Sequence, residues 1–205
     1  MNHHSSAIET FASPSELNVI IETPKGSRNK YKYDEQIGIF RLHKMLTAGA
    51  VFPFDFGFVP STRGPDGDPL DVLLLTEESV CLGSLVRAKL IGVIEADQTE
   101  KEETRRNDRL IGIASASHAY ASIHALDEIN ASLLAEIEHF FVSYNEMEDR
   151  KFKVLGRFDA TRAMKIIQAG QAHFESDRKG SKSGNRSNSR SRAYAGPAHR
   201  KSRSS

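Results

Sequence analysis

The chain has 205 residues, of which 39% are hydrophobic and 27% charged, and its net charge at neutral pH is +1. These values fit one globular domain with a sizeable core. The single cysteine, Cys81, excludes an internal disulfide framework, and no apolar run approaches the roughly 20 residues that a membrane span needs. The first residues lack the charged start and the apolar stretch of a signal peptide, so we expect a cytoplasmic protein without membrane contact.

Charge is distributed unevenly along the chain. Residues 176–205 contain nine Lys or Arg and one acidic residue, a net charge of +8, which leaves a net charge of −7 on residues 1–175. Ser, Arg, Lys and Gly dominate this tail, so we expect it to be disordered and attracted to nucleic acid or to an acidic partner; a non-specific solubilising extension is the alternative. The expected organisation is a flexible segment at 1–15, a folded domain at 16–175 and the basic tail at 176–205.

Three strands are predicted in the first part of the chain. Apolar and aromatic residues at 18–22 and 30–33 favour extended structure, and a Pro-Lys-Gly-Ser sequence at 24–27 predicts the turn between them. The purely apolar run at 72–75 predicts a buried strand.

Three carboxylates lie directly before that buried strand. Asp66, Asp68 and Asp71 fall within six residues, in the sequence Asp-Gly-Asp-Pro-Leu-Asp. Like charges at the edge of an apolar core repel one another and lose hydration, so such a cluster usually needs a bound cation or raised pKa values. Oxygen ligands alone favour a hard ion. Mg²⁺ or Mn²⁺ fits best, because Mg²⁺ combines one or two carboxylates with water and substrate phosphate.

This segment has two alternative interpretations. Gly67 and Pro69 favour a turn, in which aspartates accept backbone hydrogen bonds, but Asp71 lies against the strand rather than in the turn. A calcium-binding EF-hand loop would also be acidic. It does not fit, because Leu70 takes a ligand position and Asp71 stands where that loop requires glycine.

The second half of the chain is predicted to contain further strands and two helices. Apolar patterns at 84–95, 109–113 and 152–158 predict strands, and the charged segment 97–108 is expected to be a solvated, mobile loop. Asn130 fits the N-cap of a helix, and a second helix is predicted to open at Asp159. The first helix carries an apolar stripe, which indicates a core-facing surface: Leu133, Ile137, Phe140, Tyr144 and Met147.

The acidic motif and its surroundings resemble a family I soluble inorganic pyrophosphatase. The family signature Asp-x-Asp-Pro-x-Asp is matched by Asp66, Asp68, Pro69 and Asp71. Further matches occur in family order at Glu22, Lys30-Tyr31, 52–58, Asp97-Gln98 and 139–144. The resemblance implies an α+β or mainly-β fold, a small twisted OB-like β-barrel flanked by two C-terminal helices. It also implies hydrolysis of pyrophosphate to two phosphates with several Mg²⁺ ions, for which Mn²⁺ or Zn²⁺ could substitute, and a homo-oligomer, with a hexamer favoured over a dimer.

The same resemblance implies roles for individual residues. Asp66 and Asp71 would hold the metals that bind the attacking water, with Asp71 bridging, and Asp68 would accept or orient the proton of that water. The other implied metal-binding residues are Asp97, Glu22 (through bound water), and either Asn107 or Asp108. The implied pyrophosphate-binding residues are Lys30, Lys44, Arg109 and Tyr144.

Several positions depart from the family pattern. Asn107 stands where the family has a metal-binding aspartate, Lys44 where it has an arginine, and Arg109 where it has a lysine. Phe52 and Phe56, near the site, stand where the family has tyrosines. Two further positions change the charge of the site: Asn145 replaces a lysine and Lys32 replaces a glutamate.

These departures thin the ring of phosphate ligands, and the loss of a single electrostatic donor can cost about 10² to 10³ in rate. Three hypotheses follow. The leading one is a Mg²⁺-dependent inorganic pyrophosphatase, with room for a reduced rate. The second is a catalytically weak, pyrophosphatase-like binding or regulatory module whose basic tail engages nucleic acid or an acidic partner. The third is an enzyme that hydrolyses another phosphoanhydride, because Phe52 and Phe56 make the pocket less polar.

Overall fold

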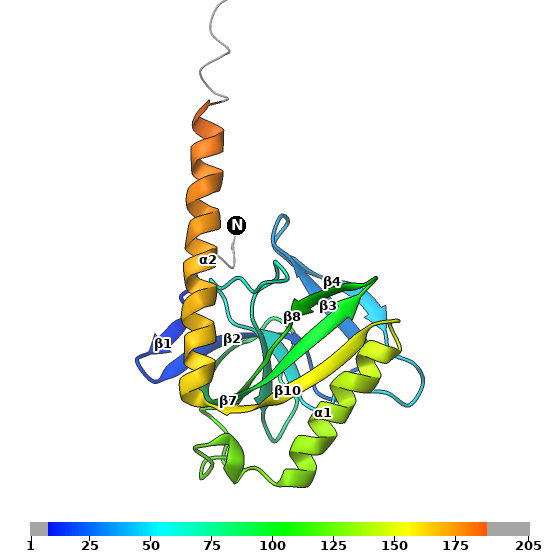
Figure 1. Ribbon diagram of the computed structural model, residues 1–205. Helices are drawn as coiled ribbons and strands as arrows, with labels where there is room; N and C mark the ends of the chain where they lie inside the picture. Colours follow the sequence, from blue (N-terminus) through cyan, green and yellow to red (C-terminus); the bar gives the residue numbers. More distant parts are fainter. Residues whose placement is uncertain (1–7, 188–205) are drawn as a thin grey trace, which may run out of the picture.

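The computed structural model describes residues 8–187 and is built around a closed barrel of five strands (Figure 1). Neighbouring strands pair in the order β2-β5-β6-β9-β7, and β7 pairs back with β2 to close the ring. Only β6 and β9 run parallel; the other neighbours in the ring are antiparallel. The bounds are β2 (Glu16–Thr23), β5 (Asp55–Phe58), β6 (Asp71–Leu75), β7 (Leu85–Glu100) and β9 (Arg109–Ala114). The predicted OB-like barrel is confirmed.

The run at 72–75 is apolar throughout because both faces of β6 are buried. Leu73 and Leu75 pack in one cluster with α1 (Ala131–Glu146), whereas Val72 and Leu74 pack in a second cluster with α2 (Ala160–Ser187). All four side chains have an exposed fraction of 0%. A strand that is covered on both faces carries no polar alternation. The carboxylates that precede it are therefore held against the most deeply buried part of the fold.

Both predicted helices are present. The Asn130 side chain accepts a hydrogen bond from Ser132 N at 2.8 Å and caps α1, and Asp159 Oδ1 accepts one from Arg162 N at 2.8 Å at the start of α2. Figure 1 shows α1 and α2 on different sides of the barrel, with the C-terminal half of α2 extending beyond it. None of the helices in the described part of the chain is long and apolar enough to cross a membrane.

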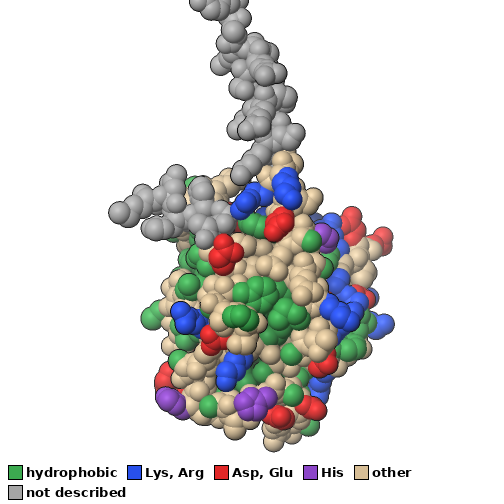
Figure 2. Space-filling view, turned by 90° about the vertical axis from the view of Figure 1, so that its left-hand side faces the viewer, with side chains coloured by type: hydrophobic (Ala, Val, Ile, Leu, Met, Phe, Trp, Pro, Cys, Tyr) green, Lys and Arg blue, Asp and Glu red, His purple; other side chains and the backbone are tan. Residues whose placement is uncertain are grey.

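The remaining elements extend or flank the barrel. β3 pairs with β4 in a separate hairpin, so the strand predicted at 30–33 does not pair with the one at 18–22. β10 pairs with β7, and β1 pairs with β2. Their bounds are β1 (Phe11–Ser13), β3 (Asn29–Asp34), β4 (Ile39–Met45), β10 (Lys151–Asp159) and a 3₁₀ turn η2 (Leu126–Glu128). Hydrophobic side chains gather on the face that carries β1 and α2 (Figure 2), where Phe11, Pro14 and Met164 line a shallow groove.

The charged segment 97–108 is not a loop, contrary to the prediction. It forms the end of β7 and most of a hairpin with β8 (Glu103–Arg106). Asp97 pairs across the hairpin with Arg106, and the hydroxyls of Thr99 and Thr104 lie 2.8 Å apart. Opposite charges and threonines that face each other across two strands stabilise a hairpin without apolar burial. A segment whose composition is typical of a solvated loop is therefore ordered by contacts between its two strands.

The two ends of the chain differ in part from the expected organisation. Within the segment expected to be flexible, 1–15, the structure describes residues from Ile8 onward and includes β1. Residues 176–187, the start of the expected disordered tail, are helical as the end of α2. Their neighbours in α2 already form a continuous helix that the tail residues extend. Residues 1–7 and 188–205 lie outside the described residues, so the predictions for them stay predictions.

Candidate functional site

The loop that carries Asp66, Asp68 and Asp71, called the aspartate loop, is shaped by hydrogen bonds of its own backbone and by Thr62. Gly64 N donates to Asp68 O at 2.7 Å, and Asp66 Oδ1 accepts from Asp68 N at 3.1 Å. Gly67 has a φ of +89°, a conformation that favours glycine. At the far end of the loop, Thr62 Oγ1 accepts from Leu70 N at 3.1 Å. The segment is thus a turn, and its three carboxylates also lie at one pocket.

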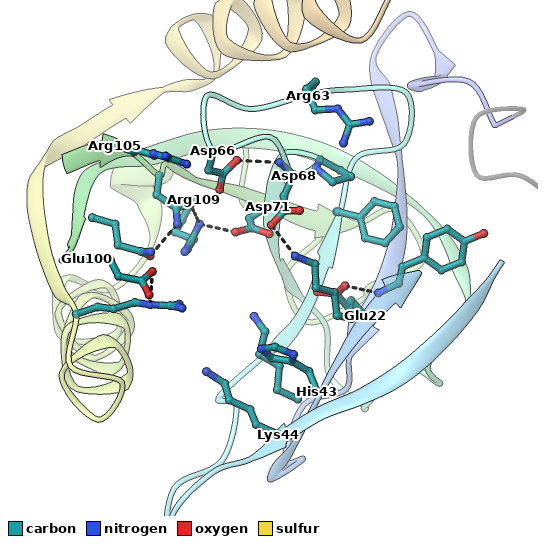
Figure 3. A pocket seen from close by; sticks show the side chains of 18 of the residues that line it. Glu22, His43, Lys44, Arg63, Asp66, Asp68, Asp71, Glu100, Arg105 and Arg109 are labelled. Carbon is teal, nitrogen blue, oxygen red and sulfur yellow. Dashed lines mark hydrogen bonds and ion pairs between the residues drawn. The ribbon is translucent and has the colours of Figure 1, made fainter. Parts of the chain in front are cut away.

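A single pocket of about 960 Å³ brings together most of the residues predicted from the sequence (Figure 3). It lies between the aspartate loop, the β3–β4 hairpin, the β7–β8 hairpin and the end of α1. Nine predicted residues line it: Glu22, Lys30, Lys44, Asp66, Asp68, Asp71, Asn107, Arg109 and Tyr144. Segments that are far apart in sequence therefore supply carboxylates and cations to one cavity.

Asp97 and Asp108 do not line this pocket. Asp97 lies 3.7 Å from Arg106 Nη1, and Asp108 accepts a hydrogen bond from Ala96 N at 3.0 Å. Successive side chains of a strand point to opposite faces, so Gln98 takes the pocket side where Asp97 does not. Asn107 likewise faces the pocket and donates from Nδ2 to Gln98 Oε1 at 2.9 Å. Of the two residues between which the sequence left the choice open, Asn107 lines the pocket and Asp108 does not, and an amide pair occupies this side.

Two pocket carboxylates carry signs of crowding. Burial raises the pKa of Glu22 from 4.5 to about 7; Lys30 and a hydrogen bond from Tyr33 N at 2.9 Å oppose this, and Asp71 adds to it. Burial, followed by the charge of Asp71, also raises the pKa of Asp66 above 3.8. Asp71 is thus close enough to repel both. Added positive charge would relieve this repulsion.

Asp55 gives a contrast within the same protein. It is completely buried, yet its carboxylate accepts from Lys25 N at 2.8 Å, from Thr76 Oγ1 at 2.7 Å and from Val80 N at 3.2 Å. Three donors satisfy it, so it needs no bound cation. Glu22 and Asp66 each accept one backbone hydrogen bond within the described residues. Their oxygen-only chemistry and their raised pKa values fit a hard divalent cation.

The cation site is not preformed in the described residues, among which no three His, Cys, Asp or Glu side chains are arranged to hold an ion. Basic side chains neutralise part of the negative charge of the carboxylates instead. Lys32 Nζ lies 2.9 Å from Asp68 Oδ2, and Arg109 Nη1 lies 2.5 Å from Asp71 Oδ2. Asp71 lies between Arg109 and Glu22 in Figure 3. The carboxylates thus fit a divalent ion by the chemistry of their oxygen atoms, although they are not arranged around an ion site.

Lys30 and Lys44 point their ammonium groups at the aromatic floor of the pocket. Lys30 Nζ lies 5.0 Å from the centre of the Phe56 ring, and Lys44 Nζ lies 4.4 Å from that of Tyr144. Phe52 and Phe56 have exposed fractions of 1% and 2%, so they support the site from beneath without lining it. Lys44 also pairs with Glu148. Burial raises the pKa of the Tyr144 hydroxyl above 10, although Lys44 lowers it.

Several pocket residues were not predicted from the sequence. Lys32, which the sequence placed close to the site, does line the pocket, and its spacing from Lys30 on β3 puts both on one face. The β7–β8 residues could not be found, because their segment was predicted to be a loop. The pocket residues outside the prediction include Arg63, Gln98, Glu100, Lys101, Glu103, Arg105 and Arg150.

The barrel and its pocket define a protein built to handle a polyanion, because carboxylates suited to a divalent cation stand beside lysines and arginines. The family model described as inorganic pyrophosphatase matches residues 19–175. This chain belongs to the inorganic pyrophosphatase family. The resemblance found in the sequence, and the class of enzyme that it implied, are confirmed at the level of the family.

Relatives and solved structures agree. The chain is 39% identical over 158 residues to the inorganic pyrophosphatase of Leifsonia xyli, covering 77% of this chain and 94% of that protein. It is 35% identical to the soluble inorganic pyrophosphatase of Zea mays, covering 76% and 71%. The structure of the inorganic pyrophosphatase of Thermus thermophilus superposes with a TM-score of 0.77 at 27% identity, over 84% of this chain and 99% of that one. That of Coxiella burnetii gives 0.75 at 33% identity, over 82% and 99%.

Proposed function

We propose that this protein hydrolyses inorganic pyrophosphate to two phosphates with Mg²⁺. One observation carries the proposal: Asp66, Asp68 and Asp71 line the same pocket as Lys30 and Lys44, in a chain of the inorganic pyrophosphatase family. Pyrophosphate carries several negative charges. A site for its hydrolysis must both attract the substrate and hold divalent cations that offset its charge.

The residues that would hold the cation are Asp66 and Asp71, with Glu22 and the amide oxygen of Asn107 nearby. Mg²⁺, when bound, supplies positive charge against the phosphate oxygens and lowers the pKa of a water ligand. Mn²⁺ and Zn²⁺ accept the same oxygen ligands and could substitute. Raised pKa values at Glu22 and Asp66 mean that protons compete with the cation for these carboxylates. Ion binding should therefore strengthen as the pH rises through about 7.

The other pocket residues act on the substrate and on the attacking water. Lys30 and Lys44 bind phosphate oxygens, and Tyr144 donates its hydroxyl hydrogen to the leaving phosphate. Asp68 is half exposed, with 52% of its side chain accessible, so it can reach a water molecule in the pocket. Its carboxylate orients that water and accepts its proton. Lys32, at 2.9 Å, holds Asp68 in place over the cavity.

The test is phosphate release from magnesium pyrophosphate by the purified protein beside an Asp68→Asn variant. Activity that the variant lacks is the expected result and excludes a contaminating enzyme. No phosphate release by folded wild-type protein would refute the proposal. Parallel assays with nucleoside triphosphates and linear polyphosphate test the third hypothesis, another phosphoanhydride as the substrate.

A second candidate function is favoured by the amide pair. Gln98 and Asn107 supply neutral oxygens where carboxylates would bind a cation more strongly, which fits a catalytically weak binding or regulatory module. In that case the basic tail at 176–205 would engage nucleic acid or an acidic partner. Salt-dependent binding of nucleic acid by the full chain and by a chain that ends at residue 175 tests this role. Equal binding by both chains would exclude a role of the tail in nucleic-acid binding.

We further propose, from the family resemblance and the composition, a cytoplasmic homo-oligomer with a hexamer favoured over a dimer. The proposed organisation remains one folded domain at 16–175 between two extensions. Sedimentation of the purified protein measures the assembly.

A further inference from the structure

Arg109 stands apart from the other cations of the pocket because it is buried. Its side chain is 5% exposed, whereas that of Lys32 is 52% exposed. The guanidinium lies over the Phe56, Phe141 and Phe152 rings, at 5.7, 5.1 and 5.5 Å from their centres. Aromatic ring faces within about 6 Å attract a cation and fix the plane of a guanidinium. Arg109 is therefore held in the wall of the pocket, with little freedom to follow a substrate.

The polar end of Arg109 is turned to Asp71. Its Nη1 donates to Asp71 Oδ2 at 2.5 Å, to Asn107 Oδ1, and to Asp108 O at 3.2 Å. Its Nε is buried and has no hydrogen-bond partner among the described residues. Because Arg109 donates to Oδ2, Oδ1 is the Asp71 oxygen without a basic partner among the described residues. The orientation of the Asp71 carboxylate is thus set by Arg109, a cation of the protein itself.

The pocket-lining neighbours of Arg109 on the β7–β8 side, Asn107 and Gln98, are neutral. Asn107 and Gln98 form an amide pair at 2.9 Å, and neither adds negative charge to that wall. The carboxylates farther out on the hairpin already have basic partners, since Glu103 lies 2.9 Å from Arg105 and Glu100 lies 3.0 Å from Arg150. Arg109 is therefore the buried cation in contact with Asp71, and its charge offsets that of this carboxylate.

We propose that Arg109 is a positioning residue that serves as a resident cation: it holds Asp71 in one orientation and weakens the binding of divalent ions on the β7–β9 side of the pocket. The inference rests on the proposed metal-dependent function, but it concerns ion binding before any substrate arrives. It differs from the role first expected for Arg109, a contact to phosphate. Arg109 also lines the pocket, but its Nη1 is already bonded to Asp71 and three aromatic rings hold its plane.

The experiment measures Mn²⁺ binding to metal-free protein, without pyrophosphate, by calorimetry and by the electron paramagnetic resonance of free Mn²⁺. Arg109→Met keeps an apolar side chain that packs on the aromatic rings but removes the charge. We expect Mn²⁺ to bind about tenfold more tightly, because a unit charge next to a ligand carboxylate no longer opposes the ion. Arg105→Met is the matched control: it removes a positive charge from the same pocket without touching Asp71. Its affinity should stay within about twofold of wild type.

Charge and structure are separated by two further variants. Arg109→Lys keeps the charge and should restore an affinity close to wild type. Arg109→Gln keeps a hydrogen-bond donor without charge and should bind Mn²⁺ more tightly, which preserves the test if the methionine variant does not fold. Unchanged or weaker Mn²⁺ binding in a folded, uncharged variant would overturn the proposal, as would tighter binding by Arg109→Lys. Pyrophosphate hydrolysis by the wild type is assayed separately, so failure of the proposed function is distinguishable from failure of this inference.

Discussion

The two walls of the pocket use opposite solutions for the same electrostatic problem. On the wall formed by the aspartate loop and β2, Glu22 and Asp66 remain without a basic side chain in contact among the described residues, and their pKa values are raised. On the β7–β8 wall, carboxylates are paired with arginines, or amides stand in their place. The first wall leaves the Glu22 and Asp66 carboxylates for an external cation, whereas the carboxylates of the second wall already have basic partners. Four predictions test this difference.

The largest expected effect is on catalysis. Asp68→Asn removes a proton acceptor from the acidic wall and should lower kcat by about 10² to 10⁴. Glu103→Gln removes a carboxylate from the opposite wall of the same pocket, where Glu103 is 72% exposed and paired with Arg105, and should change kcat by less than about twofold. Steady-state phosphate release by the two variants compares the walls directly. Equal losses would mean that the walls do not differ in function.

A smaller effect is expected from the lysines. Lys30→Met removes an ammonium group that lies over Phe56, and pyrophosphate hydrolysis should fall by about 10² to 10³ in kcat/KM. Lys101→Met, at the tip of the β7–β8 hairpin, removes the same charge from the rim of the pocket. It should cost only a few fold, since an exposed charge is screened by salt. A matching loss in both variants would show that the total charge of the pocket matters rather than its placement.

Glu22 should link stability to pH in the metal-free protein. Its pKa is 4.5 in the unfolded chain and about 7 in the folded one, so the folded state holds an extra proton between these values. Stability contributed by the protonated form is therefore lost as the pH rises through about 7. Glu22→Gln stays neutral, and it should unfold with a free energy about 1–3 kcal/mol higher than wild type at pH 8 and unchanged near pH 4.5.

Urea unfolding at the two pH values, with a chelator present, measures this difference. Glu100→Gln is the control on the other wall, where Arg150 lies 3.0 Å from the carboxylate. It should give no gain at pH 8. A gain from Glu100→Gln equal to that from Glu22→Gln would contradict the contrast between the walls.

The smallest effect is expected for the ion pair between Lys32 and Asp68. Both side chains are 52% exposed, so solvent screens their attraction. Lys32→Met should reduce the free energy of unfolding by less than about 1 kcal/mol. Thermal unfolding of the variant measures this loss. A loss of several kcal/mol would show that the aspartate loop depends on Lys32 for its structure as well as for the position of Asp68.

Much of the fold could be predicted because its signals are local. The apolar run at 72–75, the cap at Asn130 and the turn around Gly67 each depend on a few consecutive residues. The hairpin that contains β8 could not be predicted, because its order comes from partners across the strands rather than from burial. The carboxylates of the aspartate loop were found for the same reason as the strand that follows them.

The finer geometry of the site was beyond the sequence. A shift of one position along a strand exchanges its two faces, and this decides whether Asp97 or Gln98 faces the pocket. The contact between Asp71 and Arg109 joins residues 38 positions apart, on two strands whose pairing no local pattern reveals. Sequence reasoning thus identified which residues gather at the site more readily than which of them touch.

The loop that carries the aspartates is also fastened to the last helix. Arg63 N donates to Gly170 O at 2.9 Å, and a Cβ placed at Gly170 would lie 2.8 Å from Leu70 Cδ1. Gly170 does not line the pocket, yet the helix can lie this close to the loop only because position 170 has no side chain. For protein engineering, a substitution at Gly170 would therefore shift the aspartate loop and its carboxylates without altering a charged group.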